Sequence, residues 1–182
     1  ENTFKEFPEF DAICVGEGET SFMELCKRID DGEDVSETPS FIFKTIDDTG
    51  KNSFKVNPVA PLMHIDDLPF PDYTVFDYER IISDGGGVFA MMLGRGCPYQ
   101  CTYCASAHLW KAYPNPENWV RFPSIERSIE LIKRNLELYP DTKSIIFADD
   151  TFTIRKDWIK EFCAAYTKEI GLPFECNARV ET

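Results

Sequence analysis

The chain has 182 residues, 43% of them hydrophobic and 14% aromatic, which is enough to build one domain or one domain and part of another. Its 32 acidic and 19 basic residues give a formal net charge of −13. That balance disfavours nucleic acid as a partner, because a phosphate backbone requires clustered lysine and arginine. The longest uninterrupted apolar run, residues 88–93, is far shorter than the ~20 residues of a membrane helix, so we expect no membrane partner.

The ends of the chain and its cysteines indicate the setting of the protein. The sequence begins at Glu1 and shows no charged-then-apolar leader, so we expect it to be a piece of a longer protein. Seven cysteines, three clustered and four scattered, fit a reducing cytoplasm better than a disulfide framework. We therefore expect a cytoplasmic location.

The first third of the chain predicts a short strand, a helix and a hairpin. Residues 11–15 form the strand, and residues 20–31 form a helix that begins with a capping box of Ser21 and Glu24 and ends at Gly32. Its apolar face is Phe22, Leu25, Cys26 and Ile29. The glycine-rich turn between strand and helix does not suit phosphate, because two glutamates flank the helix start and no Walker lysine follows. Residues 41–46 and 53–57 pair as a hairpin through a turn at 47–51.

Strands and helices are predicted to alternate in the second half of the chain. They follow a proline-rich linker at residues 58–71. His64, in this linker, is interpreted as a surface or packing residue. Residues 106–123 are expected to be irregular. The predicted strands are residues 88–93, 144–148 and 174–180, and the predicted helices are residues 124–139 and 157–170. This alternation predicts a parallel sheet with right-handed crossovers, in which chemistry lies at the carboxyl ends of the strands.

Three cysteines follow the first of these strands, in the segment Gly94-Arg95-Gly96-Cys97-Pro98-Tyr99-Gln100-Cys101-Thr102-Tyr103-Cys104. A loop this short can direct three thiolates to one point, which predicts a metal or cluster site with an open position. Zinc held by three cysteines and His108 is chemically possible. However, structural zinc sites usually split their ligands into two separated pairs, so iron–sulfur is favoured.

This segment resembles the cluster loop of the radical S-adenosylmethionine (radical SAM) enzymes, in which C-x3-C-x-aromatic-C is one form of the motif. The resemblance implies that Cys97, Cys101 and Cys104 hold a 4Fe–4S cluster whose fourth iron binds S-adenosylmethionine. It also implies that the cluster cleaves that cofactor reductively to give a 5′-deoxyadenosyl radical. Tyr103 is expected near the adenine, where a flat ring can stack.

Three further features resemble the cobalamin-dependent branch of this family. They are the D-x-x-x-x-G-E-G-E segment that starts at Asp11, the D-L-P-x-P segment that starts at Asp67, and Asp149-Asp150 in place of a G-G-E motif. The resemblance implies that one aspartate binds the cofactor ammonium, which is electrostatically sensible. Adjacent strand residues point to opposite faces, so Asp149 and Asp150 cannot both line one pocket unless the strand has ended. Arg179 is a further cofactor-binding candidate, and no residue is assigned a catalytic role.

The expected fold is α/β: a partial radical SAM barrel of three β/α units, preceded by a remnant and hairpin of a Rossmann-like cobalamin-binding domain. The expected divisions are 1–57 for the remnant, 58–83 for the linker and 84–182 for the half barrel. The resemblance implies cobalamin bound outside this chain, a small-molecule or peptide substrate, and a reductant such as flavodoxin or ferredoxin. Methyl transfer or related radical chemistry is the favoured function. A methylthiotransferase-like enzyme without cobalamin, or a non-catalytic iron–sulfur or zinc module, are the alternatives.

Overall fold

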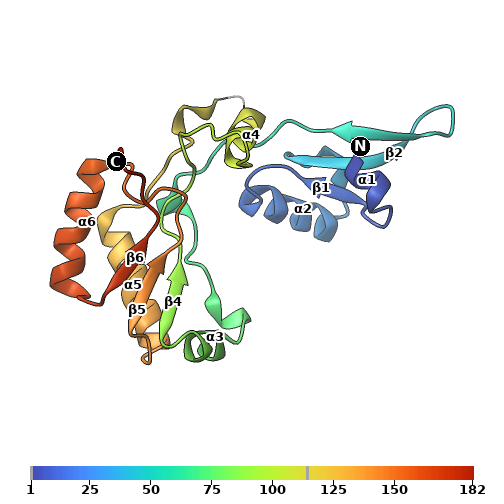
Figure 1. The fold of residues 1–182 in the computed structure, drawn as a ribbon. Helices are drawn as coiled ribbons and strands as arrows, with labels where there is room; N and C mark the ends of the chain where they lie inside the picture. Colours follow the sequence, from blue (N-terminus) through green and yellow to red (C-terminus); the bar gives the residue numbers. More distant parts are fainter. Residues whose placement is uncertain (1, 114) are drawn as a thin grey trace. The chain divides into compact units, whose positions relative to one another are not determined.

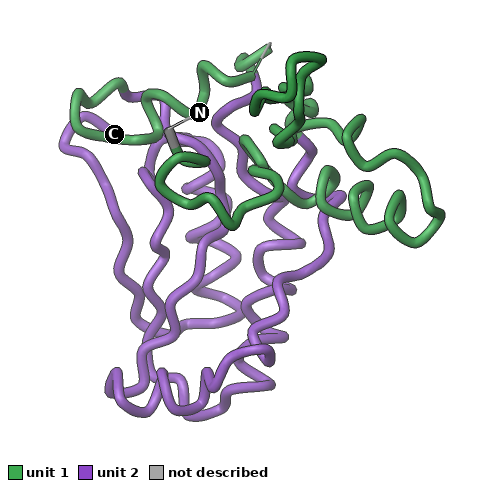
Figure 2. Tube along the Cα trace, turned by 90° about the vertical axis from the view of Figure 1, so that its right-hand side faces the viewer, with its two compact units in different colours: residues 1–62, 100–117 green, residues 63–99, 118–182 purple. Residues whose placement is uncertain are grey.

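A computed structural model describes residues 2–113 and 115–182. The chain divides into two compact units (Figure 2). Unit 1 comprises residues 1–62 and 100–117, and unit 2 comprises residues 63–99 and 118–182. The three-part division of these residues expected from the sequence stays a prediction.

Unit 1 is built on a three-stranded antiparallel sheet in the order β1-β2-β3, with β1 at Ala12–Cys14, β2 at Phe41–Ile46 and β3 at Asn52–Val56. This confirms the predicted strand and hairpin. The hairpin turn closes through the Asp47 carboxylate, which accepts hydrogen bonds from the backbone N–H groups of Thr49 and Lys51. The unit also contains α1 (Asn2–Glu6), α2 (Glu19–Asp31) and the 3-10 turn η1 (Val35–Glu37).

Helix α2 confirms the predicted span but not its predicted details. It begins after Gly18, so the capping box of Ser21 and Glu24 is wrong, and it ends as expected at Gly32, whose φ is 69°. Ser21 is its buried residue, whereas Phe22 is 59% exposed and Ile29 60% exposed. Of the predicted apolar face, Leu25 is partly buried, and Phe22, Cys26 and Ile29 are exposed.

The segment 100–117 of unit 1 packs against the glycine-rich turn that precedes α2. The segment holds α4 (Ser106–Leu109) and η4 (Trp110–Ala112), and η5 (Pro116–Asn118) begins at its end, so the expectation of an irregular stretch is wrong in part. The Tyr113 hydroxyl accepts a 2.6 Å hydrogen bond from the N–H of Glu17. Gly16 has φ of 89°, and a Cβ there would lie 2.5 Å from the same hydroxyl, so glycine is required on both counts. The turn thus packs against a tyrosine.

Unit 2 is built on a three-stranded parallel sheet in the order β4-β5-β6 (Figure 1), with β4 at Val88–Met91, β5 at Ser144–Phe147 and β6 at Phe174–Cys176. The crossovers are α5 (Ile125–Leu138) and α6 (Lys156–Glu169), and α3 (Tyr78–Asp84) precedes β4. The turns η2 (Ile65–Asp67) and η3 (Tyr73–Val75) precede α3. The predicted parallel alternation is confirmed, although the third strand ends at Cys176 rather than residue 180.

The core of unit 2 lies between the sheet and its two crossover helices. Side chains of the strands and of α5 and α6 form one buried cluster. Phe147 and Phe162 are both 0% exposed, and their rings meet edge to face at 5.5 Å. Among the described residues, no helix is both long and apolar enough to cross a bilayer.

Tyr166 of α6 makes this core sensitive to alkaline pH. The side chain is 3% exposed and its hydroxyl donates to the carbonyl of Leu172, and burial raises its pKa to about 12. Because the unfolded value is near 10, the folded state favours the neutral phenol, whose contribution is complete below pH 10 and lost as pH rises toward 12. We expect the free energy of unfolding to fall over that range by urea titration. The fall should be smaller in Tyr166→Phe; an equal fall in both proteins would contradict the assignment.

Candidate functional site

The chemistry-bearing residues predicted from the sequence follow the carboxyl ends of the strands of unit 2. Cys97 follows β4, Asp149 and Asp150 follow β5, and Arg179 follows β6. In a parallel sheet these ends share one edge (Figure 1), where open α/β folds place their ligands.

Asp149 fixes the start of the segment that carries the three motif cysteines, residues 94–104, called here the cysteine loop. It is 2% exposed, and its two carboxylate oxygens accept the backbone N–H groups of Leu93 at 3.2 Å and Gly94 at 2.5 Å. Burial raises the pKa of Asp149, against the lowering effect of these two hydrogen bonds. Its own carbonyl accepts from the side-chain amide of Asn177 at 3.0 Å. Asp149 therefore joins the loops that follow all three strands.

The next residues of the loop are held by residues 119–122. Arg95 and Arg121 form an antiparallel bridge with N···O distances of 2.8 and 2.9 Å. Gly94 packs so closely that a Cβ there would lie 2.9 Å from the Arg121 carbonyl oxygen. The indole N–H of Trp119 donates to the carbonyl of Cys97 at 3.2 Å. The backbone from residue 93 to residue 97 is thus anchored at each of its ends.

Gly96 is required by this anchoring, and the requirement can be measured. Its φ is 82°, and a Cβ there would overlap the backbone oxygen of Trp119. Gly86 has φ of 73° with nothing within 4 Å of its Cβ position. Gly86→Ala should cost about 1–2 kcal/mol, the price of a left-handed backbone alone. Gly96→Ala should cost roughly twice that, because overlap adds to the backbone term. Urea unfolding of the two variants measures the difference in the free energy of unfolding. Equal losses of stability would show that Trp119 moves to accommodate the added Cβ without destabilising the protein.

The thiol of Cys97 contacts a side chain of the neighbouring loop. Cys97 Sγ lies 3.6 Å from Oγ1 of Thr151, which is 4% exposed. Tyr99, two residues further on, lies under the guanidinium of Arg179, 3.9 Å from ring centroid to Cζ. Arg179 also pairs with Glu181 at 3.2 Å. The loop that follows β6 is therefore in contact with the cysteine loop.

Cys101 and Cys104 belong to the segment of unit 1, where the Cys104 N–H donates to the Cys101 carbonyl at 3.0 Å. All seven cysteines are free, and the three of the motif are partly exposed. Across residues 2–113 and 115–182, no three His, Cys, Asp or Glu side chains converge as metal ligands. The donor chemistry nevertheless fits an iron–sulfur cluster, since three reduced, accessible thiols lie within eight residues. Tyr103 is 91% exposed, so its ring is open to a planar ligand.

Asp149 and Asp150 both lie after the end of β5 and differ in exposure. Asp149 is buried, whereas Asp150 is exposed. His108 is exposed and lies in α4.

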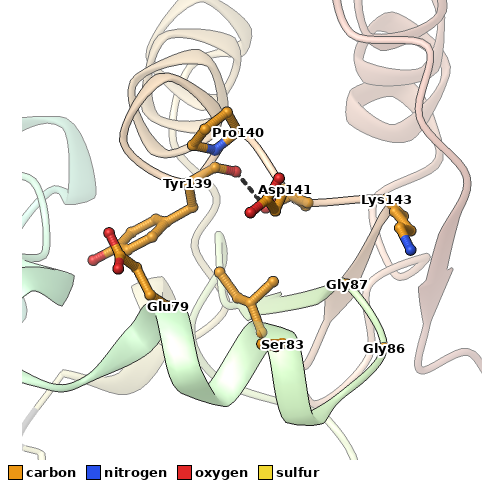
Figure 3. A pocket seen from close by; sticks show the side chains of 10 residues that line it. Glu79, Ser83, Gly86, Gly87, Tyr139, Pro140, Asp141 and Lys143 are labelled. Atoms are coloured by element: carbon orange, nitrogen blue, oxygen red, sulfur yellow. Dashed lines mark hydrogen bonds between the residues drawn. The ribbon is translucent and has the colours of Figure 1, made fainter.

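A hollow of about 600 Å³ lies at the opposite edge of the sheet (Figure 3). It is lined by α3 and by the turn between α5 and β5, including Glu79, Asp141 and Lys143. Gly87 and Lys143 directly precede β4 and β5, so this hollow marks the amino ends of the strands. It takes no part in the site at the carboxyl edge.

Sequence reasoning missed Thr151, Trp119 and Asn177. Each acts on residues 22 to 54 positions away along the chain, through a contact created by folding. One signal was present: Thr151 directly follows the two aspartates at the end of a predicted strand.

The family model of the radical SAM superfamily matches residues 91–181, which is half of the chain. An uncharacterized methyltransferase of Pyrococcus horikoshii is 30% identical over 184 residues, covering 100% of this chain and 38% of that protein. The anaerobic magnesium-protoporphyrin IX monomethyl ester cyclase of Rubrivivax gelatinosus is 27% identical, covering 97% and 31%. Cytidylyl-2-hydroxyethylphosphonate methyltransferase of Streptomyces wedmorensis is 24% identical, covering 92% and 35%. The chain thus spans about a third of the length of these relatives.

Among solved structures, the radical SAM methyltransferase TsrM of Kitasatospora setae superposes with a TM-score of 0.59 at 17% identity, covering 91% of this chain and 30% of that one. That structure contains tryptophan and a SAM analog, and a second structure of TsrM, with a TM-score of 0.58, contains cobalamin and a [4Fe-4S] cluster. At this identity the likeness concerns the fold. The match of the family model over half of the sequence shows that the chain belongs to the radical SAM superfamily.

Proposed function

We propose that the chain is the cluster-binding part of a radical SAM enzyme, with Cys97, Cys101 and Cys104 as the ligands of a 4Fe–4S cluster. When bound, such a cluster supplies the electron that cleaves S-adenosylmethionine to a 5′-deoxyadenosyl radical. The observation that carries the proposal is the anchored cysteine loop at the carboxyl edge of a parallel sheet. Five consecutive residues, 93–97, are fixed there by contacts from Asp149, Arg121 and Trp119.

We further propose that residues 84–182, which include the sheet of unit 2, form the first half of the barrel. One face of the sheet packs on α5 and α6 through Phe89, Ile145 and Phe147. The alternate residues Ala90, Ile146 and Glu175 lie in register across the other face, and the first and last are exposed. A sheet covered by helices on one side only is what a barrel wall requires, since its other side faces the interior. Residues 1–57, within unit 1, are proposed to be the remnant of the cobalamin-binding domain.

The two aspartates receive different roles in this proposal. Both oxygens of Asp149 are already engaged with the loop backbone, so Asp149 positions the cysteine loop. Asp150 is exposed at the same edge and is the carboxylate better placed to meet the ammonium of the cofactor. Arg179 and Tyr103 complete the proposed cofactor contacts, with Arg179 held over Tyr99 and Tyr103 open to the adenine.

The favoured reaction is cobalamin-dependent methyl transfer or related radical chemistry. Two relatives are named methyltransferases, and TsrM binds cobalamin in its solved structure. The cobalamin would be held by parts of the protein outside these residues. The substrate would be a small molecule or peptide, and a flavodoxin or ferredoxin would supply electrons.

The test is a reductive cleavage assay on the complete protein. Purified without oxygen and loaded with iron and sulfide, the protein should convert S-adenosylmethionine to 5′-deoxyadenosine with dithionite or flavodoxin as reductant. Cobalamin copurified from replete cells should be stoichiometric. Cleavage without cobalamin would favour the methylthiotransferase-like alternative, and a cluster without cleavage would favour an electron-carrying module.

A further inference from the structure

Thr151 brings a buried hydroxyl to the sulfur of Cys97. Its Oγ1 lies 3.6 Å from Cys97 Sγ and 2.8 Å from the carbonyl oxygen of Asp150, to which it donates. A hydroxyl has a single proton, so these two acceptors compete for it. Neither the family match nor the sequence motif assigns this residue a role.

The competition changes when Cys97 binds metal. A free thiol can donate its own proton to the threonine oxygen while the threonine donates to Asp150. A metal-bound cysteine has lost that proton and can only accept. A charged acceptor binds a hydroxyl proton more strongly than a neutral carbonyl does, and turning the hydroxyl requires no movement of the backbone. We propose, on the basis of the function proposed above, that Thr151 donates a hydrogen bond to the cluster-bound Cys97 sulfur and thereby raises the cluster's reduction potential.

The surroundings of Thr151 hold this hydroxyl in place. Asp149, two residues earlier in the chain, is bound to Leu93 and Gly94, and the next residue, Phe152, is 0% exposed within the core. Thr151 itself is 4% exposed, so bulk water does not compete strongly for its proton.

The effect on the potential has a defined sign. Reduction adds negative charge to a cluster and its thiolates, and a donor pointed at a ligand sulfur stabilises the reduced form more than the oxidised form. Removing the donor should therefore make the midpoint potential more negative. A tenfold change in the equilibrium between the two forms corresponds to about 59 mV for one electron.

The experiment is a redox titration of the complete, cluster-loaded protein, followed by electron paramagnetic resonance. Thr151→Val keeps the shape of the side chain and removes the hydroxyl. It should make the midpoint potential more negative, by an amount that corresponds to a several-fold to tenfold change in the equilibrium between the reduced and oxidised forms. Thr151→Ser keeps the hydroxyl and should restore the wild-type potential. The matched control is Thr142→Val: Thr142 is 8% exposed and donates to Tyr139 at the amino end of β5, so its loss should leave the potential unchanged.

A second readout does not depend on any variant holding a cluster. Electron–nuclear double resonance of the wild-type cluster in H₂O and D₂O should reveal an exchangeable proton coupled to the iron through Cys97. Its absence, or a Thr151→Val potential equal to that of wild type, would overturn this inference alone. A wild-type protein that binds no cluster would overturn the proposed function, and this inference with it.

Discussion

Replacing Cys101 with serine should remove most of the iron and sulfide from the reconstituted protein. Three thiolates are the complete set of protein ligands proposed here, and a serine hydroxyl is a poor ligand for iron because it stays protonated at neutral pH. Iron and acid-labile sulfide should fall to a small fraction of the wild-type content, with loss of the cluster absorption. Equivalent losses are expected for serine at Cys97 and Cys104.

Cys26→Ser supplies the control for this loss. Cys26 is an exposed free thiol on α2, outside the motif, and its replacement should leave the iron content at the wild-type level. Full iron in Cys101→Ser would show that the motif is not the ligand set. Equal losses in both variants would show that iron binds to thiols without selection.

Asp149→Asn should destabilise unit 2 on the order of 3 kcal/mol. The amide has nearly the same shape as the carboxylate but offers only one acceptor oxygen, so its NH₂ group faces the N–H of either Leu93 or Gly94. A buried donor left without an acceptor costs its desolvation free energy, and a neutral acceptor binds the other N–H less strongly. Urea unfolding measures the loss, and hydrogen exchange should accelerate at the two amides.

The neighbouring aspartate provides a matched comparison. Asp150 is exposed, and Asp150→Asn should change the free energy of unfolding by less than about 0.5 kcal/mol. If both variants unfold at the wild-type urea concentration, the carboxylate of Asp149 does not fix the loop. Slow exchange at residues 93 and 94 in Asp149→Asn would lead to the same conclusion.

The parallel sheet could be predicted from the sequence because each of its signals is local. Buried strands alternate with amphipathic helices from residue 88 onward. This alternation of strands and helices implies a parallel sheet with crossover connections. The end of the third strand could not be predicted, because a tertiary contact determines it. The side-chain amide of Asn177 donates to the carbonyl of Asp149, and the backbone carbonyl of Asn177 accepts from the N–H of Phe152. These contacts end the parallel β5–β6 pairing after Cys176.

Helix α2 shows a different limit of pattern reading. Its period correctly predicted a helix, but a hydrophobic stripe carries no information about what covers it. Phe22 and Ile29 remain exposed within the part of the chain that the structure describes, while the small polar Ser21 is 2% exposed. The sequence therefore predicted the element and its end at Gly32, but not the face it buries.

The site shows the same division between local and distant information. Spacing alone identified Cys97, Cys101 and Cys104 as ligand candidates. Strand geometry did not predict the different burial of Asp149 and Asp150, because β5 ends at Phe147, before both residues. The anchors of the loop come from residues 22 to 56 positions away, so no local pattern could reveal them. Cofactor binding by Asp149 or Asp150 stays a prediction, and the contacts of Asp149 support a role in positioning the loop.

The central claim is that the cysteine loop holds a 4Fe–4S cluster with one iron open to S-adenosylmethionine. The most direct measurement is the electron paramagnetic resonance spectrum of the anaerobically reconstituted, reduced protein, with and without that cofactor. The account predicts a 4Fe–4S signal whose g values shift on addition, because the cofactor becomes a ligand of the open iron. A preparation that takes up stoichiometric zinc and no cluster, or a cluster in the complete protein whose spectrum does not respond to the cofactor, would contradict it.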